Sequence, residues 1–126
     1  MISLGSLSFQ GDHFAAGGSH DGTAIRVWLS GDANINAAEP VARLLMGVHN
    51  EVKKLRANTV VVDFSKLEFI NSACLKRFVT WISHVRDLEV SSQYQIRLVA
   101  NDKVPWQRRS MSALRCVAVR LVSLDS

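Results

Sequence analysis

The sequence predicts an α/β domain built on a mixed, mostly parallel β-sheet. Strand-like segments alternate with helix-like segments through most of the chain, which is typical of βαβ units. The apolar run Val60-Val61-Val62 lacks polar alternation, and such a run indicates a strand buried on both faces. The length of 126 residues fits one domain, so we expect a single unit over residues 1–126.

The first third of the chain predicts two strands separated by a loop. Leu7 and Phe9 alternate with polar residues and indicate a short edge strand. The glycine-rich segment 11–18 is expected to be a flexible loop, so that residues 1–21 form a strand plus this loop. Residues 23–29 then alternate in the pattern of a half-buried strand, after the turn signal Asp21-Gly22.

The rest of the chain alternates helix and strand. A helix is expected from Pro40 to Leu55, because apolar residues recur there at helical spacing. A second helix should begin at Asn71-Ser72 and end near Leu88 or Val90. A third should begin at Pro105. Strands are expected over residues 59–64, 95–100 and 118–124, with connections over 32–39 and 65–70.

Composition favours an ordinary globular protein. The hydrophobic fraction is 48% and the charged fraction 21%. No run is long enough to span a bilayer and the first residues lack a signal-peptide pattern, so we expect a cytoplasmic protein without membrane attachment. Cys74 and Cys116 fall in expected helices, and we interpret both as reduced thiols packed as small apolar groups. The net charge of +4 is interpreted as a solvated basic face.

The usual catalytic patterns do not occur. The chain lacks a phosphate-binding glycine loop, a dinucleotide fingerprint and a nucleophile elbow. Its four histidines share no metal-ligand spacing, and His49 is expected to be a solvated helix position. We therefore predict a protein that is not an enzyme and that needs neither a metal nor a cofactor.

The segment from Val60 to Trp81 is the most informative. A buried strand carries Asp63 at its end, a short connection follows, and a helix starts at a hydroxyl. Asp63 is expected to serve structure, although ligands often bind at this edge of α/β sheets. Ser72 is most simply a helix cap. A helix N-terminus also suits a phosphate, because its free amides and dipole favour negative charge, so Ser72 is physically suited to accept one.

This same segment resembles a known family. The stretch Asp63-Phe64-Ser65, followed by an apolar connection and Asn71-Ser72-Ala73-Cys74-Leu75, is similar to the signature of the STAS (SpoIIAA-like, anti-sigma-factor antagonist) family, a strand ending in DLS followed by DSSGL. Upstream, residues 27–34 with Gly31 are similar to the LxGxLD segment of that family. The resemblance covers about residues 22–124, and the departures from the signature mark a divergent member.

The resemblance implies a small sheet with helices packed mainly on one side and no catalytic activity. Bacterial members of the family bind a serine-kinase anti-sigma factor, and a phosphatase reverses the phosphorylation that this kinase performs. It implies Ser72 as the phosphoacceptor. The surrounding residues would bind the partner or support the site: Asn71, Ala73, Cys74, Lys76 and Arg77 as partner-binding residues, and Asp63 and Gly31 as supporting residues.

Three departures from the signature leave alternatives open. Asn71 replaces an acidic residue, Ala73 a second serine and Cys74 a glycine. The first alternative is a STAS-like interaction or oligomerisation module without phosphorylation, which leaves a homodimer open. Nucleic-acid binding through the basic second half is disfavoured, because Trp106 is the only aromatic residue beside that cluster. The role of the segment Trp106-Gln107-Arg108-Arg109 is not predicted by the signature.

Overall fold

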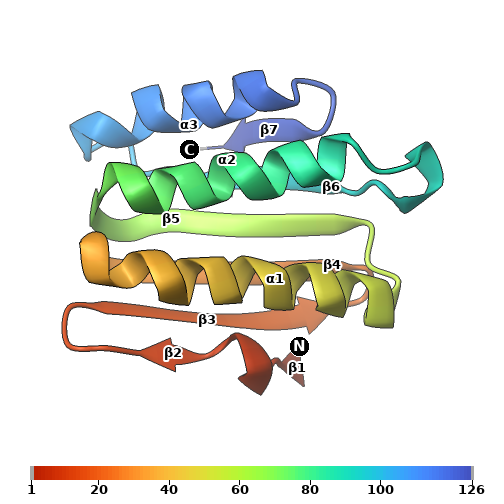
Figure 1. Ribbon diagram of the computed structural model, residues 1–126, viewed down its shortest axis with the longest axis horizontal. Coiled ribbons are helices and arrows are strands. Elements are labelled where there is room, and N and C mark those ends of the chain that lie inside the picture. Colours follow the sequence, from red (N-terminus) through yellow and green to blue (C-terminus); the bar gives the residue numbers. More distant parts are fainter. Residues whose placement is uncertain (1, 126) are drawn as a thin grey trace.

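Three helices lie side by side over one face of a β-sheet in the computed structural model, which describes residues 2–125 (Figure 1). The α/β fold predicted from the sequence is thereby confirmed. The helices are α1 (Ala38–Leu55), α2 (Ser72–Arg86) and α3 (Pro105–Val117), and the short 3-10 turns are η1 (Gly5–Leu7), η2 (Ile35–Ala37) and η3 (Val90–Ser92). The strands are β1 (Ile2–Ser3), β2 (Phe9–Gln10), β3 (Phe14–Asp21), β4 (Ala24–Ala33), β5 (Thr59–Ile70), β6 (Gln95–Val99) and β7 (Val122–Asp125).

The sheet has the strand order β1-β3-β4-β5-β6-β7, with β2 also paired to β3. The four strands from β4 to β7 are parallel, because each is connected to the next through a helix. The β3 strand runs antiparallel to β4 and also pairs with β1 and β2. All three helices therefore begin at one edge of the sheet, where the parallel strands end (left in Figure 1).

The core lies between this sheet and the helical layer. Apolar side chains of α1, α2 and α3, such as Val48, Ile82 and Leu114, are fully buried against it. Val60 and Val62 face the helices, whereas Val61 points to the helix-free face and is still only 3% exposed. The expectation of a strand buried on both sides is thus met.

The prediction that the glycine-rich segment 11–18 forms a flexible loop is wrong. Most of this segment belongs to β3, which pairs with β4 from Phe14 to Asp21. Its small residues serve close packing. A Cβ atom on Gly17 would lie 2.6 Å from Cζ2 of Trp28, whose ring stands over the helix-free face, and one on Gly18 would lie 2.6 Å from Cδ1 of Leu7. The absence of side chains here makes room for neighbouring ones and does not produce a mobile loop.

The prediction of a connection over residues 65–70 is also wrong, since β5 continues to Ile70. Its pairing with β4 shifts register between Trp28 and Ser30 and again between Gly31 and Asp32. These irregularities interrupt the alternation of apolar and polar residues, so the sequence pattern does not indicate a strand here. The longer strand carries the chain directly to the start of α2.

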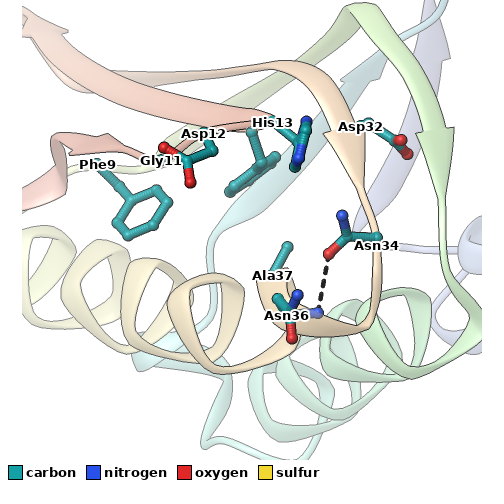
Figure 2. Close-up of a pocket in the computed structure, with 9 residues that line it drawn as sticks. Phe9, Gly11, Asp12, His13, Asp32, Asn34, Asn36 and Ala37 are labelled. Carbon is teal, nitrogen blue, oxygen red and sulfur yellow. Dashed lines mark hydrogen bonds between the residues drawn. The ribbon is translucent and has the colours of Figure 1, made fainter.

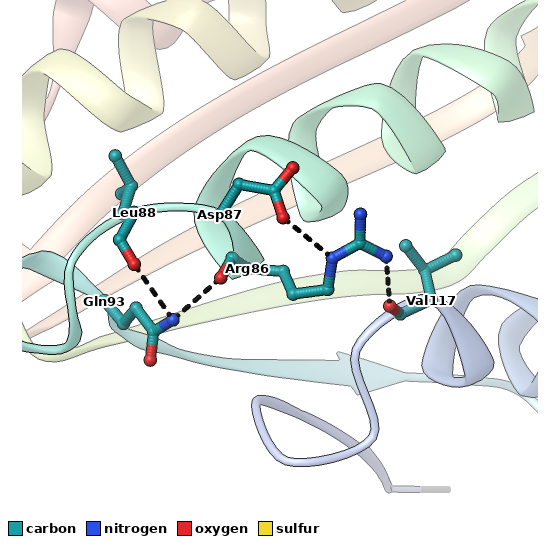
Figure 3. Close-up of polar contacts among 5 residues, drawn as sticks. All are labelled: Arg86, Asp87, Leu88, Gln93 and Val117. Atoms are coloured by element: carbon teal, nitrogen blue, oxygen red, sulfur yellow. Dashed lines mark hydrogen bonds and ion pairs between the residues drawn. The ribbon is translucent and has the colours of Figure 1, made fainter.

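The last turn of α2 is tied to its surroundings (Figure 3). The Arg86 guanidinium donates to the Val117 carbonyl at 3.0 Å, and the Gln93 amide donates to the carbonyls of Arg86 and Leu88 at 2.8 and 3.2 Å. The helix ends at Arg86, whereas the sequence predicted an end near Leu88 or Val90. Within residues 2–125, no helix has the length and apolar character that crossing a membrane requires.

Candidate functional site

Ser72 is the first residue of α2, directly beyond the edge where the parallel strands end, and its side chain is exposed. The residue before it, Asn71, is the N-cap: its Oδ1 accepts a hydrogen bond from the Ala73 amide at 2.7 Å. Asn71 also donates its own amide to the Ala33 carbonyl at 2.7 Å, which ties the helix start to the end of β4. The interpretation of Ser72 as the cap is therefore wrong, and its hydroxyl is not needed for that role.

The residues after Ser72 turn inward. Cys74 is fully buried, and its Sγ donates to the Asn34 carbonyl of the preceding 3-10 turn at 3.3 Å. Burial raises the pKa of this thiol, so it stays protonated. Cys74 therefore packs α2 against η2 and presents no surface to a partner, contrary to the expectation from the resemblance. Cys116, expected to be packed, is exposed; both cysteines are free thiols.

Exposed apolar and basic side chains occur on the elements next to Ser72. Phe69, three residues earlier, is 48% exposed, and Ile35 in the neighbouring η2 turn is 61% exposed. Lys76 lies four residues after Ser72, on the same side of α2, and is exposed. Arg77 is also exposed but faces the groove between α1 and α2, away from Ser72. We call the surface formed by Ile35, Phe69, Ser72 and Lys76 the Ser72 surface.

The strand leading to Ser72 is held from the other side by α3. Gln107 is fully buried, and its Nε2 donates to the carbonyls of Phe64 and Leu67 at 2.7 and 2.9 Å. Its Oε1 accepts from the Asn101 amide at 2.7 Å. All polar atoms of this side chain are thus paired, and they fix the end of β5 to the start of α3.

Two further side chains from the same segment bind β5. Trp106 donates its indole N–H to the Glu68 carbonyl at 2.8 Å, and Asn101 donates its amide to the Ser65 carbonyl at 3.3 Å. The Ser65 amide in turn donates to Asp63 at 2.8 Å, which gives Asp63 a structural contact within the strand end. The segment containing Trp106 and Gln107 therefore positions the Ser72 surface. The sequence signal that could have found it is a glutamine at a core-facing helical position.

Gly31 shapes the neighbouring strand. It has a φ of +87°, and a Cβ atom there would lie 2.3 Å from the His13 carbonyl oxygen. Because that space is free, the Asp32 amide donates to the His13 carbonyl at 2.7 Å, and β4 turns into η2. A small hollow of about 170 Å³ lies next to this turn (Figure 2), and there Asn34 accepts from the Asn36 amide at 2.9 Å.

His49 is not the solvated position expected. It is half-buried, and its Nδ1 lies 3.0 Å from the Tyr94 hydroxyl. Its ring packs edge-on against that of His84, with centroids 5.1 Å apart. Across residues 2–125, no group of three or more histidine, cysteine, aspartate or glutamate side chains is placed to hold a metal ion.

The strand order and the single layer of helices define a STAS-type α/β fold. A solved structure described as an anti-sigma factor antagonist from Mycobacterium paratuberculosis is similar to this chain, with a TM-score of 0.66. The match covers 92% of this chain and 88% of that one at 16% sequence identity, which confirms the STAS-type fold and fits a divergent sequence. No protein-family model and no curated protein matches the sequence.

Proposed function

We infer that this protein is a regulatory protein-binding domain that acts as an anti-sigma-factor antagonist in partner switching in the bacterial cytoplasm. The similar structure from Mycobacterium paratuberculosis is described as an anti-sigma factor antagonist. The observation that carries the proposal is the exposed Ser72 hydroxyl at the first position of α2, beside exposed apolar side chains. The protein acts by binding and not by catalysis.

The unphosphorylated Ser72 surface binds the partner. Phe69 and Ile35 supply the apolar area that such contacts bury, and Lys76 at its rim attracts acidic groups. The partner is a serine-kinase anti-sigma factor, and a phosphatase restores the free serine. Because Asn71 already caps the helix, modification of Ser72 removes no hydrogen bond that α2 requires.

Phosphorylation of Ser72 would change the charge of this surface without unfolding it. The phosphate adds about −1.5 to −2 charges at neutral pH. The helix N-terminus stabilises those charges, and Lys76 lies one turn further on to pair with them. The same charges would place a hydrated anion on the Ser72 surface, whose apolar area the partner must dehydrate. Binding is therefore lost while the domain stays folded.

The test begins with phosphorylation. The purified chain is incubated with ATP and each serine-kinase anti-sigma factor of its source organism, and the products are mapped by mass spectrometry. We expect one phosphate on Ser72 and none on Ser112, an exposed serine within α3 that serves as the matched control.

Binding to the same kinases is then measured by calorimetry for Ser72→Ala, Ser72→Asp and Ser112→Asp. We expect Ser72→Asp alone to lose binding. Equal binding by all three variants, together with an unmodified Ser72, would reject the switch and favour an interaction module without phosphorylation. Self-association measured by light scattering would then identify that module as a homodimer.

A further inference from the structure

A groove runs between α1 and α2 on the outer side of the helical layer, separate from the Ser72 surface. Its volume is about 370 Å³. Each helix lines it with residues at positions i, i+3, i+4 and i+7, which is one face of a helix over two turns or about 10 Å. These residues are Ala42, Leu45, Met46 and His49 of α1, and Arg77, Thr80, Trp81 and His84 of α2. We call this the α1–α2 groove.

The floor of the α1–α2 groove is apolar. Leu45 and Trp81 are buried beneath it, whereas Met46 stands on its rim and is 69% exposed. An exposed methionine beside buried apolar side chains offers a flexible surface that adapts to a bound partner. The centre of the groove can therefore bury the apolar side chains of another molecule.

A chain of hydrogen bonds below the groove fixes the proton positions at one end. The Trp81 indole can only donate, and it donates to the Tyr94 oxygen at 3.0 Å. Burial raises the pKa of Tyr94 to about 12, so its hydroxyl keeps its proton and can donate a hydrogen bond to Nδ1 of His49, 3.0 Å away. Burial, with Lys53 and His84 nearby, lowers the pKa of His49 and favours the neutral ring, and a neutral ring that accepts from Tyr94 at Nδ1 carries its hydrogen on Nε2.

Arg77 and the Nε2–H of His49 are hydrogen-bond donors that line the α1–α2 groove, whereas the Thr80 oxygen, whose hydrogen is already used, can only accept there. Arg77 lies at one end, and His84 and the Nε2–H of His49 lie at the other. The Thr80 hydroxyl already donates to the Lys76 carbonyl at 3.0 Å. The residues described as lining the groove include no carboxylate. A complementary ligand carries apolar side chains at its centre and negative charge at its ends.

We propose that the α1–α2 groove docks an acidic amphipathic helix of a protein partner. The two parallel ridges that line it suit a helix of two turns, which lays its apolar face on Leu45, Met46 and Trp81. A carboxylate of the same helix lies beside Arg77. A small molecule would stay exposed on the open side, whereas small-molecule sites bury about 70–90% of their ligand. This surface is independent of the proposed switch at Ser72.

The experiment titrates the isotope-labelled full chain with two synthetic stapled helices of about 15 residues. Both carry leucine at positions i, i+3 and i+7; one has glutamate beside them and the other lysine. We expect the acidic helix to shift the NMR signals of groove residues, including the Trp81 indole N–H. We expect the dissociation constant of the basic helix to be about tenfold higher than that of the acidic helix. This ratio corresponds to a difference of ~1.4 kcal/mol in binding free energy.

Three variants identify the site. Met46→Glu, at an exposed rim position that leaves the core intact, should abolish the shifts, and Arg77→Glu should reverse the preference for the acidic helix. Lys54→Glu, an exposed change on α1 outside the groove, is the matched control and should keep both the shifts and the preference for the acidic helix. Ser72→Asp should also leave the shifts unchanged, so a failed switch and a failed groove are distinguished.

Two outcomes would overturn the proposal. The first is equal affinity for the two helices, or shifts that persist in Met46→Glu, because either means that the groove does not select this ligand. The second is a homodimer in light scattering that Met46→Glu dissociates, because a second copy of the chain would then occupy the groove.

Discussion

The two ends of α2 are built in opposite ways. At its carboxyl end, Arg86 and Gln93 tie the last turn to neighbouring carbonyls, so the polar groups of that turn are satisfied within the protein (Figure 3). At its amino end, one side chain, Asn71, caps the helix, and Ser72 beside it faces outward. The carboxyl end is fixed by polar side chains of its own turn and of the segment after it, whereas the amino end is fixed by the Asn71 and Cys74 contacts and by the strand before it. The hydroxyl at the start of α2 is thus exposed, although the backbone that carries it is held in place.

We expect the largest effect from removing the Gln107 hydrogen bonds that hold the strand before the amino end of α2. Gln107→Met keeps the volume of the side chain but leaves the Phe64 and Leu67 carbonyls and the Asn101 amide without partners. We expect a loss of about 3 kcal/mol in the free energy of unfolding, measured with urea. Gln95→Met, at an exposed position of β6, is the control and should change it by less than about 0.5 kcal/mol.

Hydrogen exchange in the same variant tests where the support acts. The Leu75 amide, bonded to the Asn71 carbonyl at 3.0 Å, should exchange faster, while amides near Arg86 should lose less protection. Equal loss of protection at both ends would mean that Gln107 stabilises the whole domain and does not position the start of α2.

The second test separates the cap from the switch. Asn71→Ala should cost about 1 kcal/mol, because the Ala73 amide loses its acceptor. Ser72→Ala should cost less than about 0.5 kcal/mol, because its exposed hydroxyl does not cap the helix. Thermal unfolding of both variants measures the difference, and the reverse order would assign the cap to Ser72.

The carboxyl end should respond more weakly to a single change. Arg86→Met removes the hydrogen bond to the Val117 carbonyl but leaves both Gln93 bonds in place. We expect a loss of about 0.5 kcal/mol, since the guanidinium is half exposed and water can replace it. Arg43→Met on α1 is the control, because its nearest carboxylate, on Glu39, is 3.9 Å away. A loss as large as that of Gln107→Met would remove the contrast between the two ends.

Sequence patterns predicted the parts of this fold that depend on local chemistry. The helix stripes, the Pro105 start of α3 and the buried run Val60–Val62 follow from residue spacing, and each is present. The Asn71-Ser72 pair placed the start of α2 correctly but not the capping residue. Either side chain can cap, and only the backbone position decides between them.

The missed features depend on contacts between distant residues. The glycines of β3 resembled a loop because the Trp28 ring and the Leu7 side chain that occupy their space come from other segments. A glutamine at a core-facing helical position marks Gln107 as unusual, but its partners could not be predicted, because they lie on β5 about 40 positions earlier in the chain. Register shifts between β4 and β5 hid the last part of β5. Such long-range pairings determine how the Ser72 surface is held.

The contact between His49 of α1 and Tyr94, behind the middle of α2, offers the smallest effect and the one that depends on pH. His49 accepts from Tyr94 only while its ring is neutral, and burial lowers its pKa below the ordinary value of about 6.5. The unfolded chain therefore binds a proton at a higher pH than the folded one, so the stability from this contact is complete above pH ~6.5 and declines as the pH falls below it. His49→Gln should reduce this decline, while His84→Gln, at an exposed position, should retain most of it. Urea unfolding of the three proteins at several pH values measures the slopes, and an unchanged slope in His49→Gln would show that the decline comes from other titratable groups.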